Sequence, residues 1–270
     1  MAAGANHRDA SQSDGLLGTG DPAPFEVVNP DSSSPVVLTC EHAGRKIPRA
    51  LGDLGVADTE MDRHIAYDIG AAQVARRLNT ALNAVLILQS FSRLVIDCNR
   101  PVEAPDSVPE ISDGTRIPGN SGLDATARQS RFDAIHRPFH QEISRQIETR
   151  TAAGREVLLV AVHSFTPQLR SRDGPRPWHI GLLYNRSDEL AEQFMQGLNR
   201  HDATLHAAFN EPYRIDDRSD YTIPVHGEGR GIPHVLLEIR NDLIAEAVGQ
   251  NYFARLFAAI IGDAIKERTV

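Results

Sequence analysis

The stretch Val157-Leu-Leu-Val-Ala-Val-His-Ser-Phe-Thr-Pro167 is an apolar run that ends abruptly in a histidine, His163. A continuous apolar run of this length is typical of a strand that is buried on both faces of a parallel sheet. In open α/β sheets, ligand sites form outside the carboxyl ends of such strands. The stretch therefore predicts an α/β fold and places His163 at a candidate site.

Three other apolar segments end in the same way. Val36 to His42 ends in Glu-His, Leu94 to Arg100 ends in Asp-Cys-Asn-Arg, and His234 to Glu238 ends in a glutamate. Polar and ionisable side chains are costly to bury unless they pair or bind a metal. Four strand ends of this kind indicate one shared site.

Helical segments alternate with these strands. We expect helices over residues 62–82, 124–150 with a break near Pro138, 187–198 and 242–266, and further strands over residues 84–89 and 178–184. Apolar strands that alternate with helices predict a mostly parallel, mixed sheet covered on both faces. We predict fold class α/β: a single three-layer α/β/α domain, phosphorylase/hydrolase-like, over residues 22–270. Residues 1–21 are polar and are expected to form a disordered tail.

The chain has 270 residues, of which 41% are hydrophobic and 24% charged, and its net charge is −8. The negative charge argues against binding to nucleic acid. No apolar run is long enough to span a membrane, and the N-terminus lacks the apolar region of a signal peptide. Only two cysteines are present, Cys40 and Cys98, which does not suggest a disulfide framework. We expect a cytoplasmic protein with a small-molecule partner, no nucleic-acid or membrane partner, and an unknown oligomeric state.

Two histidines, His42 and His163, are the first candidates for a metal site. Catalytic zinc usually takes three protein ligands and leaves a fourth position open. Asp68, expected early in the helix over residues 62–82, is the favoured third ligand. Two alternatives stay open: His64, on the same helical face, and Glu41, expected on the opposite face of its strand. We predict that Zn²⁺ or another divalent ion binds to His42, Asp68 and His163.

A separate role is expected for Glu238. A carboxylate at the end of a buried strand has a raised pKa unless something compensates it, which suits a general base. One of Arg93 and Arg100 could stabilise a developing oxyanion, and the other could hold a substrate carboxylate. A structural alternative is that these arginines form an ion-pair cluster with Asp97.

With these residues in view, the chain resembles the N-formylglutamate amidohydrolase family from about Phe25 to Ile261. The matching stretches are Thr39-Cys-Glu-His-Ala-Gly with Ile47-Pro48, His64-Ile-Ala-Tyr-Asp-Ile-Gly-Ala, Phe91-Ser-Arg-Leu-Val-Ile-Asp-Cys-Asn-Arg-Pro, Pro138-Phe-His140, His163-Ser-Phe-Thr-Pro and Leu237-Glu-Ile-Arg-Asn-Asp. The resemblance implies hydrolysis of a linear amide, with N-formyl-L-glutamate as the substrate, L-glutamate and formate as the products, and a place in histidine degradation.

A more distant resemblance, to zinc carboxypeptidases, implies roles for single residues. Ile96-Asp-Cys-Asn-Arg100 resembles the stretch that binds the terminal carboxylate, His163-Ser164 the zinc-binding His-Ser, and Glu238-Ile-Arg-Asn the stretch with the general base. The carboxypeptidase His-x-x-Glu pair would need a glutamate at position 45, where this chain has Arg45. Zinc-dependent muramoyl-alanine amidases take that ligand from the following helix, and this analogy favours Asp68.

The sequence therefore predicts a zinc-dependent amidohydrolase of a small N-acyl amino acid. The predicted catalytic residues are Glu238 and Arg93. The predicted substrate-binding residues are Asn99, Arg100 and His140. The loop over residues 101–121 is expected to close over the substrate.

Two alternatives to this function stay open. One is a peptidoglycan or peptide amidase or carboxypeptidase, against which the missing signal peptide weighs. The other is a metal-free, small-acid-binding protein on the same fold, against which the intact His42, His163 and Glu238 weigh.

Overall fold

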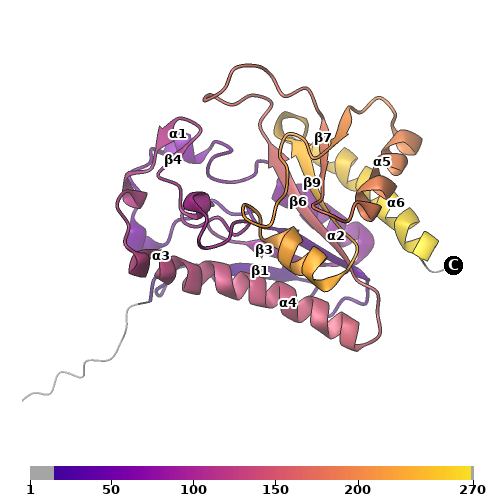
Figure 1. The fold of residues 1–270 in the computed structure, drawn as a ribbon, viewed down its shortest axis with the longest axis horizontal. Helices are drawn as coiled ribbons and strands as arrows, with labels where there is room; N and C mark the ends of the chain where they lie inside the picture. The colour runs from indigo at the N-terminus through magenta and orange to yellow at the C-terminus, as the bar shows by residue number, and fades with distance from the viewer. Residues whose placement is uncertain (1–14, 269–270) are drawn as a thin grey trace, which may run out of the picture.

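The computed structural model describes residues 15–268, which form a mixed sheet with helices on both faces (Figure 1) and a separate two-stranded sheet of β4 and β5. The strands are β1 Phe25–Val28, β2 Val36–Cys40, β3 Val85–Gln89, β4 Ile111–Ser112, β5 Thr115–Arg116, β6 Leu158–Phe165, β7 Ile180–Leu183, β8 Ala207–Phe209 and β9 His234–Arg240. The α-helices are α1 Asp58–Met61, α2 Ala71–Leu82, α3 Ala125–Arg131, α4 Arg137–Ala152, α5 Glu189–His201 and α6 Ala247–Arg268. Shorter 3₁₀ and π turns are η1 Arg49–Leu51, η2 Pro105–Ser107, η3 Pro118–Asn120, η4 Phe132–His136, η5 Ile223–Gly227, η6 Glu228–Arg230 and η7 Asn241–Leu243.

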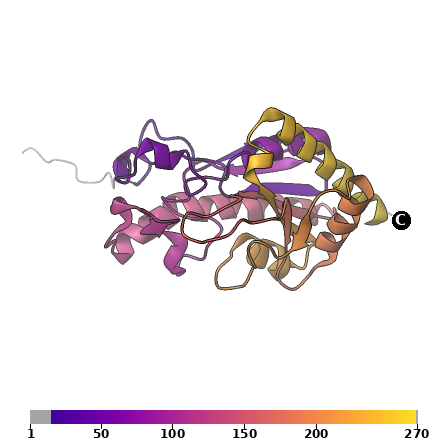
Figure 2. The same cartoon turned by 90° about the horizontal axis from the view of Figure 1, so that it is seen from above.

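The main sheet has seven strands in the order β1-β3-β2-β6-β9-β7-β8. The central strands β3, β2, β6 and β9 are parallel, whereas β1 is antiparallel to β3 and β7 is antiparallel to β9. Helices α2, α5 and α6 pack on one face and α4 on the other, and Figure 2 shows α4 and α6 on opposite sides of the strands. The predicted three-layer α/β/α domain with a mostly parallel, mixed sheet is confirmed.

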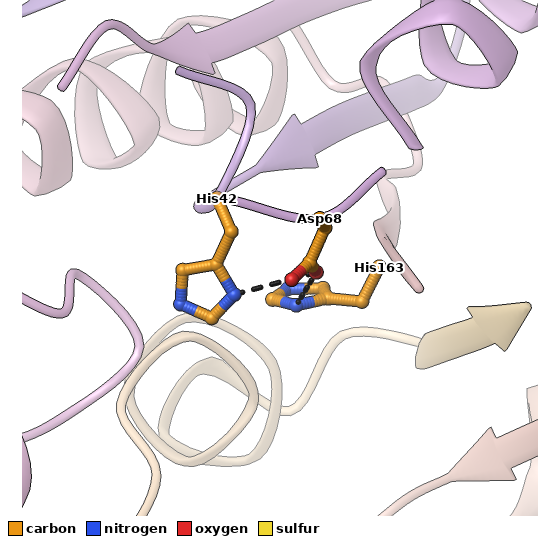
Figure 3. A group of neighbouring side chains, drawn as sticks. All are labelled: His42, Asp68 and His163. Carbon is orange, nitrogen blue, oxygen red and sulfur yellow. Dashed lines mark hydrogen bonds and ion pairs between the residues drawn. The ribbon is translucent and has the colours of Figure 1, made fainter. Parts of the chain in front are cut away.

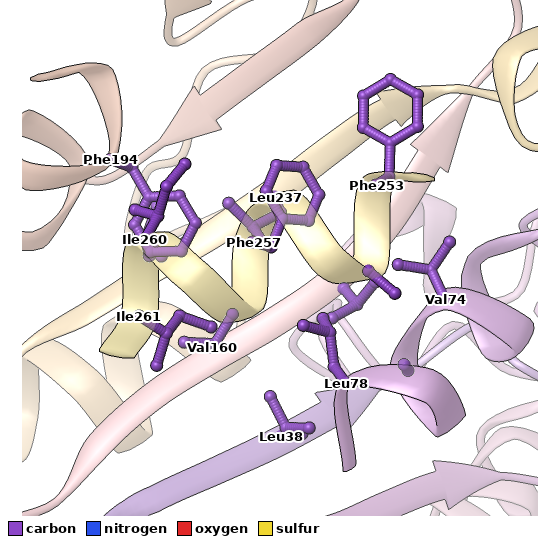
Figure 4. Packing of buried hydrophobic residues seen from close by; sticks show 14 of the residues in the cluster. Leu38, Val74, Leu78, Val160, Phe194, Leu237, Phe253, Phe257, Ile260 and Ile261 are labelled. Atoms are coloured by element: carbon purple, nitrogen blue, oxygen red, sulfur yellow. The ribbon is translucent and has the colours of Figure 1, made fainter. Parts of the chain in front are cut away.

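Alternate residues of each central strand pack into opposite layers, as the two-residue period of a strand requires. In β2, Leu38 faces α2 and α6, whereas Val37 faces the layer that contains α4. Helix α6 packs Phe257 and Ile261 against the sheet in the first layer (Figure 4). Because both faces of these strands are covered, their sequences are continuously apolar.

One predicted strand is wrong. The segment Leu94–Asp97 is buried but forms a turn, in which the Val95 N–H donates to Ser92 O at 2.9 Å and the Asp97 N–H to Ser107 O at 2.7 Å. A four-residue apolar run fits a buried turn as well as a strand, because burial alone does not provide a neighbouring strand to pair with. The other predicted strands correspond to β2, β3, β6, β7 and β9.

The helix predicted over residues 62–82 is also wrong in its first half. Helix α2 begins only at Ala71, after Gly70, which has a φ of 80°. Gly70 is in the left-handed region that L-residues rarely adopt, so the chain turns there and does not continue as a helix. Asp68 and His64 therefore lie in the turns before α2 and not on one helical face.

The break predicted near Pro138 is confirmed. Helix α3 passes through the π turn η4 into α4, in which Pro138 occupies the first turn, where a missing N–H costs little. The C-terminal helix begins at Ala247, later than predicted, because residues 241–243 form the short turn η7.

Residues 1–14 of the expected tail lie outside the described residues. Residues 15–21 contact the domain: Leu16 and Leu17 pack against the core layer that contains α4, and Asp21 Oδ1 accepts a hydrogen bond from the Arg49 N–H at 3.0 Å. Both cysteines are buried free thiols. Within residues 15–268, no helix combines the length and the apolar character that crossing a membrane would need.

Candidate active site

Three side chains predicted to bind a metal converge on one point (Figure 3). One ligand atom from each of His42, Asp68 and His163 lies within 4.8 Å of the others, and all three residues are buried. Asp68 Oδ2 lies 3.0 Å from His163 Nδ1 and 3.4 Å from His42 Nδ1. The Nδ1 atoms of both imidazoles therefore face the same carboxylate oxygen.

Three different elements position these side chains. His42 lies just after β2, His163 lies within β6, and Asp68 lies in the turn before α2. The Asp68 N–H donates to His42 O at 2.9 Å, and the Ser164 N–H donates to Asp68 Oδ2 at 3.1 Å. The turn before α2 is thus tied to both neighbouring strands, which fixes the Asp68 carboxylate between the two imidazoles.

Each imidazole also contacts a carboxylate through its other nitrogen. His42 Nε2 lies 2.7 Å from Asp97 Oδ1, and His163 Nε2 lies 2.7 Å from Glu41 Oε2. A carboxylate accepts a hydrogen bond from Nε2–H, so the lone pair of Nδ1 is left toward Asp68. Histidines that bind a metal usually have such an orienting carboxylate on the second nitrogen.

The charges of this cluster suit a cation. Burial alone would raise the pKa of Asp68, but His42 and His163 outweigh it and hold the pKa below its ordinary value. Burial alone would lower the pKa of His163, but hydrogen bonds to Asp68 and Glu41 raise it well above the ordinary value. The carboxylates thus stabilise positive charge at this point, whether carried by a proton or by a metal ion. One carboxylate and two neutral imidazoles are a donor set that suits a divalent transition metal such as zinc.

The predicted general base, Glu238, lies beside this cluster on β9. It is paired in register with His163 across two parallel strands, so both side chains leave the same face of the sheet. Its Oε2 atom is buried and has no hydrogen-bond partner among the described residues. Burial raises the pKa of Glu238 to about 8, and Asp68 contributes to that increase. A buried carboxylate without a partner is costly and is a common feature of catalytic sites.

Arg93 joins the cluster to an open cleft of about 390 Å³. Its guanidinium donates to Asp97 Oδ2 at 2.6 Å and lies 3.5 Å from Asp68 Oδ1. Arg93 and Asp97 line the cleft together with His64 and Tyr213. The cleft therefore adjoins the buried cluster at Arg93, which contacts Asp68, and at Asp97, which contacts His42.

Two predicted substrate-binding residues are engaged elsewhere. Arg100 donates to Asp106 at 3.1 Å, to Asp220 at 3.0 Å and to Ser219 O. Asn99 Nδ2 donates to Asp220 at 3.2 Å, and Asn99 Oδ1 accepts the Thr222 N–H at 3.1 Å. Neither residue lines the cleft beside Arg93. Both instead hold the loop over residues 210–233 against the turn that contains Asp97.

The third predicted substrate-binding residue, His140, lies in a separate group of histidines. His140 Nε2 lies 2.6 Å from Cys98 O, and His140 Nδ1 lies 3.0 Å from His226 Nε2. His136 and Tyr221 pack against it, and these residues line a second cavity of about 350 Å³. The structure thus separates His140 from the cleft beside Arg93.

The two alternative metal ligands have other partners. His64 lies 3.4 Å from Asp113, at the wall of the cleft. Glu41 contacts the outer nitrogen of His163 and accepts from Thr222 Oγ1 at 2.9 Å. Sequence reasoning missed the roles of Glu41 and Asp97 as orienting partners of the two histidines. A signal was present, because each is an acidic residue directly at the end of an apolar segment.

The sequence matches the model of the N-formylglutamate amidohydrolase family over residues 34–245. The chain belongs to the N-formylglutamate amidohydrolase family. Among solved structures, that of gene product Atu2144 from Agrobacterium tumefaciens is 37% identical, with a TM-score of 0.89, and the match covers 94% of this chain and 100% of the other.

The structure of N-formylglutamate amidohydrolase from Ralstonia eutropha JMP134 is 20% identical, with a TM-score of 0.65 over 92% of this chain and 100% of the other. At that identity, the likeness shows the common fold. No match is found among curated proteins.

Proposed function

We propose that this chain is a metal-dependent amidohydrolase that cleaves the amide bond of a small N-acyl amino acid, with N-formyl-L-glutamate as the first candidate. One observation carries the proposal: Glu238, a buried carboxylate whose Oε2 atom has no hydrogen-bond partner within residues 15–268, is paired in register with His163 of the His42–Asp68–His163 cluster. Membership of the N-formylglutamate amidohydrolase family supports the hydrolase class.

A divalent ion, with zinc as the first candidate, would be held by His42, Asp68 and His163. Bound there, it would supply Lewis-acid polarisation of the scissile carbonyl and favour ionisation of water. Asp97 and Glu41 keep the two imidazoles in the tautomer that presents Nδ1. The backbone N–H of Ser164 holds the Asp68 carboxylate in place.

Glu238 acts as the general base and then as the general acid. It takes a proton from water as the water oxygen adds to the formyl carbon. It returns that proton to the amide nitrogen as the carbon–nitrogen bond breaks, which gives formate and the free amine. Burial raises the pKa of Glu238 toward neutral pH, which suits proton transfer in both directions.

Arg93 stabilises the negative charge that develops on the carbonyl oxygen, because its guanidinium lies between Asp97 and Asp68 and borders the cleft. Asn99 and Arg100 serve as positioning residues in this scheme, since their side chains hold the loop over residues 210–233. This positioning role differs from the direct binding of a substrate carboxylate that the carboxypeptidase resemblance implies.

The test is hydrolysis of N-formyl-L-glutamate by purified protein whose metal content has been measured. We expect one equivalent of divalent metal, release of formate, loss of activity with a chelator and recovery with zinc. The variant Asp68→Asn should lose both metal and activity. A protein that binds no divalent metal, or that hydrolyses a panel of N-acyl amino acids equally well with chelator present, would contradict the proposal.

A further inference from the structure

The cleft beside Arg93 is lined by cationic side chains that have no carboxylate partner within the described part of the chain, whereas its carboxylates are paired. Three carboxylates line it, Asp97, Asp106 and Asp113, and each already has a cationic partner. The partners are Arg93 for Asp97 at 2.6 Å, Arg100 for Asp106 at 3.1 Å and Arg63 for Asp113 at 2.7 Å.

Two other arginines line the same cleft, Arg172 and Arg176. Within residues 15–268, neither has a carboxylate within ion-pair distance, while other arginines of the cleft region do. A cleft with two guanidinium groups free of carboxylates favours a ligand that brings negative charge.

Arg176 is held in place without being neutralised. Its Nη1 donates to the Tyr213 hydroxyl at 2.9 Å, and its guanidinium lies 4.9 Å from the centre of the Tyr213 ring. The Arg176 N–H donates to Pro167 O at 2.7 Å, which fixes the loop that carries it. A guanidinium has five N–H donors, so one bond to a neutral hydroxyl leaves a two-donor edge for a carboxylate.

Arg176 also lies close enough to the predicted general base, Glu238, for its charge to act on that carboxyl group. It is one of the residues whose charge acts on Glu238, together with Arg93 and His163. Arg93 is next to Asp68 and Asp97, whereas Arg176 belongs to the loop that follows β6 and forms another wall. The α-carboxylate of an N-acyl amino acid is one carbon away from the scissile nitrogen. A side-chain carboxylate reaches farther from the reacting centre, toward such a wall.

We propose that Arg176, oriented by Tyr213, binds the side-chain carboxylate of the substrate and determines specificity for acidic N-acyl amino acids. Arg172, more exposed at the same wall, adds positive charge to this subsite. The inference rests on the proposed function for its substrate class. It assigns recognition of the side-chain carboxylate to residues outside the Asn99–Arg100 stretch, which the resemblance to carboxypeptidases favoured.

The experiment compares N-formyl-L-glutamate with N-formyl-L-glutamine, which differ only in the charge of the side chain. In the wild type we expect a higher kcat/KM for the glutamate substrate. In Arg176→Gln this preference should fall at least about 10-fold, mainly through KM, because a charge-assisted bidentate pair is lost. Arg176→Lys should recover part of the preference, since it keeps the charge but loses the planar fork.

Arg170→Gln is the matched control, because Arg170 belongs to the same loop but pairs with Glu60 at 3.0 Å and does not line the cleft. It should keep the wild-type preference. An unchanged preference in Arg176→Gln, or equal loss for both substrates, would overturn the assignment.

Binding measurements separate this inference from the proposed function. In Glu238→Gln protein, calorimetry gives Kd values for the two ligands, with and without Arg176→Gln. If the wild type hydrolyses neither substrate, the proposed function fails. The Arg176 assignment then still stands if tighter binding of the glutamate ligand disappears with Arg176→Gln, and fails if the Kd ratio stays the same.

Discussion

Single side chains decide the chemistry of this site because each has a distinct partner. The Nε2 atoms of His42 and His163 contact Asp97 and Glu41, and their Nδ1 atoms face Asp68. Both nitrogens of each imidazole therefore have a carboxylate neighbour. Glu238 differs, since its Oε2 atom is buried and has no partner within the described part of the chain. A group that is left unsatisfied in a fold with many satisfied neighbours is the first place to look for function.

The first prediction concerns that carboxylate. Glu238→Gln keeps the size of the side chain but removes its ability to exchange a proton. We expect kcat to fall at least about 10²-fold, the usual contribution of a general base. Metal content and the circular dichroism spectrum should stay unchanged, and both should be measured on the same preparation.

Glu192→Gln serves as the control, because Glu192 is exposed on α5 and belongs neither to the His42–Asp68–His163 cluster nor to the lining of the cleft. It should retain wild-type turnover. Near-normal kcat in Glu238→Gln with metal present would assign the base to another residue.

The turn between β2 and α2 is the element that assembles the site. It brings Asp68 to His42 by a backbone hydrogen bond and ends in Gly70, whose φ is 80°. A Cβ on Gly70 would lie 2.3 Å from Ile244 O, closer than real contacts allow. The glycine is thus required both by its backbone conformation and by the close approach of the segment before α6.

The second prediction tests this requirement. Gly70→Ala should destabilise the fold by about 1 to 3 kcal/mol, from left-handed strain and the clash with residue 244. It should also weaken metal binding, because Asp68 is two residues away in the same turn. Urea denaturation and metal titration measure the two effects.

Gly262→Ala in α6 is the matched control, since a Cβ there meets nothing within 4 Å and the backbone is helical. It should be neutral or stabilising by up to about 1 kcal/mol, because alanine favours helices. Equal effects of the two substitutions would argue against a special role for Gly70.

The elements of this fold were predictable where a segment was long and strongly patterned. Strands β2, β6 and β9 are apolar on both faces, so their sequences alone indicated buried parallel strands. Leu94–Asp97 is equally buried but forms a turn, because pairing depends on neighbours that a short run does not encode. The extent of α2 depended on Gly70, whose left-handed backbone turns the chain just before the helix.

The site residues at the ends of apolar strands could be predicted from the sequence. Contacts between loops that are distant in the sequence were harder to predict. His42, His163 and Glu238 follow from the ends of apolar segments, and Asp68 was placed correctly in space despite the wrong helix. The contacts of Arg100 and Asn99 with Asp220 could not be foreseen, because Asp220 lies on a distant loop. The role proposed for Arg176 has no local signal in the sequence, since it depends on which carboxylates already pair with other arginines.

The thermal stability of the whole molecule should depend on the bound metal. An ion that binds only the folded state adds to stability in proportion to its concentration relative to Kd. The third prediction is that removal of metal by a chelator lowers Tm by about 5 to 10 °C and that zinc restores it. Asp68→Asn should abolish the response to zinc, and an identical zinc shift in that variant would place the ion elsewhere.

The fourth prediction concerns acid, and it depends on the histidines near α4. Burial lowers the pKa of His136 to about 4 and that of His226 to about 3, below the ordinary value near 6.5. Between the lowered pKa of each histidine and 6.5, the unfolded chain binds more protons than the folded one. The free energy of unfolding therefore rises with pH in this range. Above pH 6.5 each histidine contributes on the order of 1 to 3 kcal/mol to the free energy of unfolding. This contribution is lost as the pH falls toward 4 for His136 and toward 3 for His226.

Urea denaturation of wild type and His136→Gln at several pH values between 7 and 4.5 tests this expectation. The variant should lose less stability on acidification, because glutamine does not titrate. His206→Gln, which changes an exposed histidine, should follow the wild type. Parallel curves for wild type and His136→Gln would show that His136 does not contribute to acid sensitivity.

Both strands at the edges of the sheet are short: β1 has four residues and β8 has three. An edge strand exposes unpaired N–H and C=O groups to which another chain can add a strand, and a short edge offers few of them. The long apolar strands β6 and β9, which would aggregate readily if exposed, lie between neighbours on both sides. The sheet order therefore protects the folded protein against self-association through its backbone, and it leaves that risk to the partly unfolded chain.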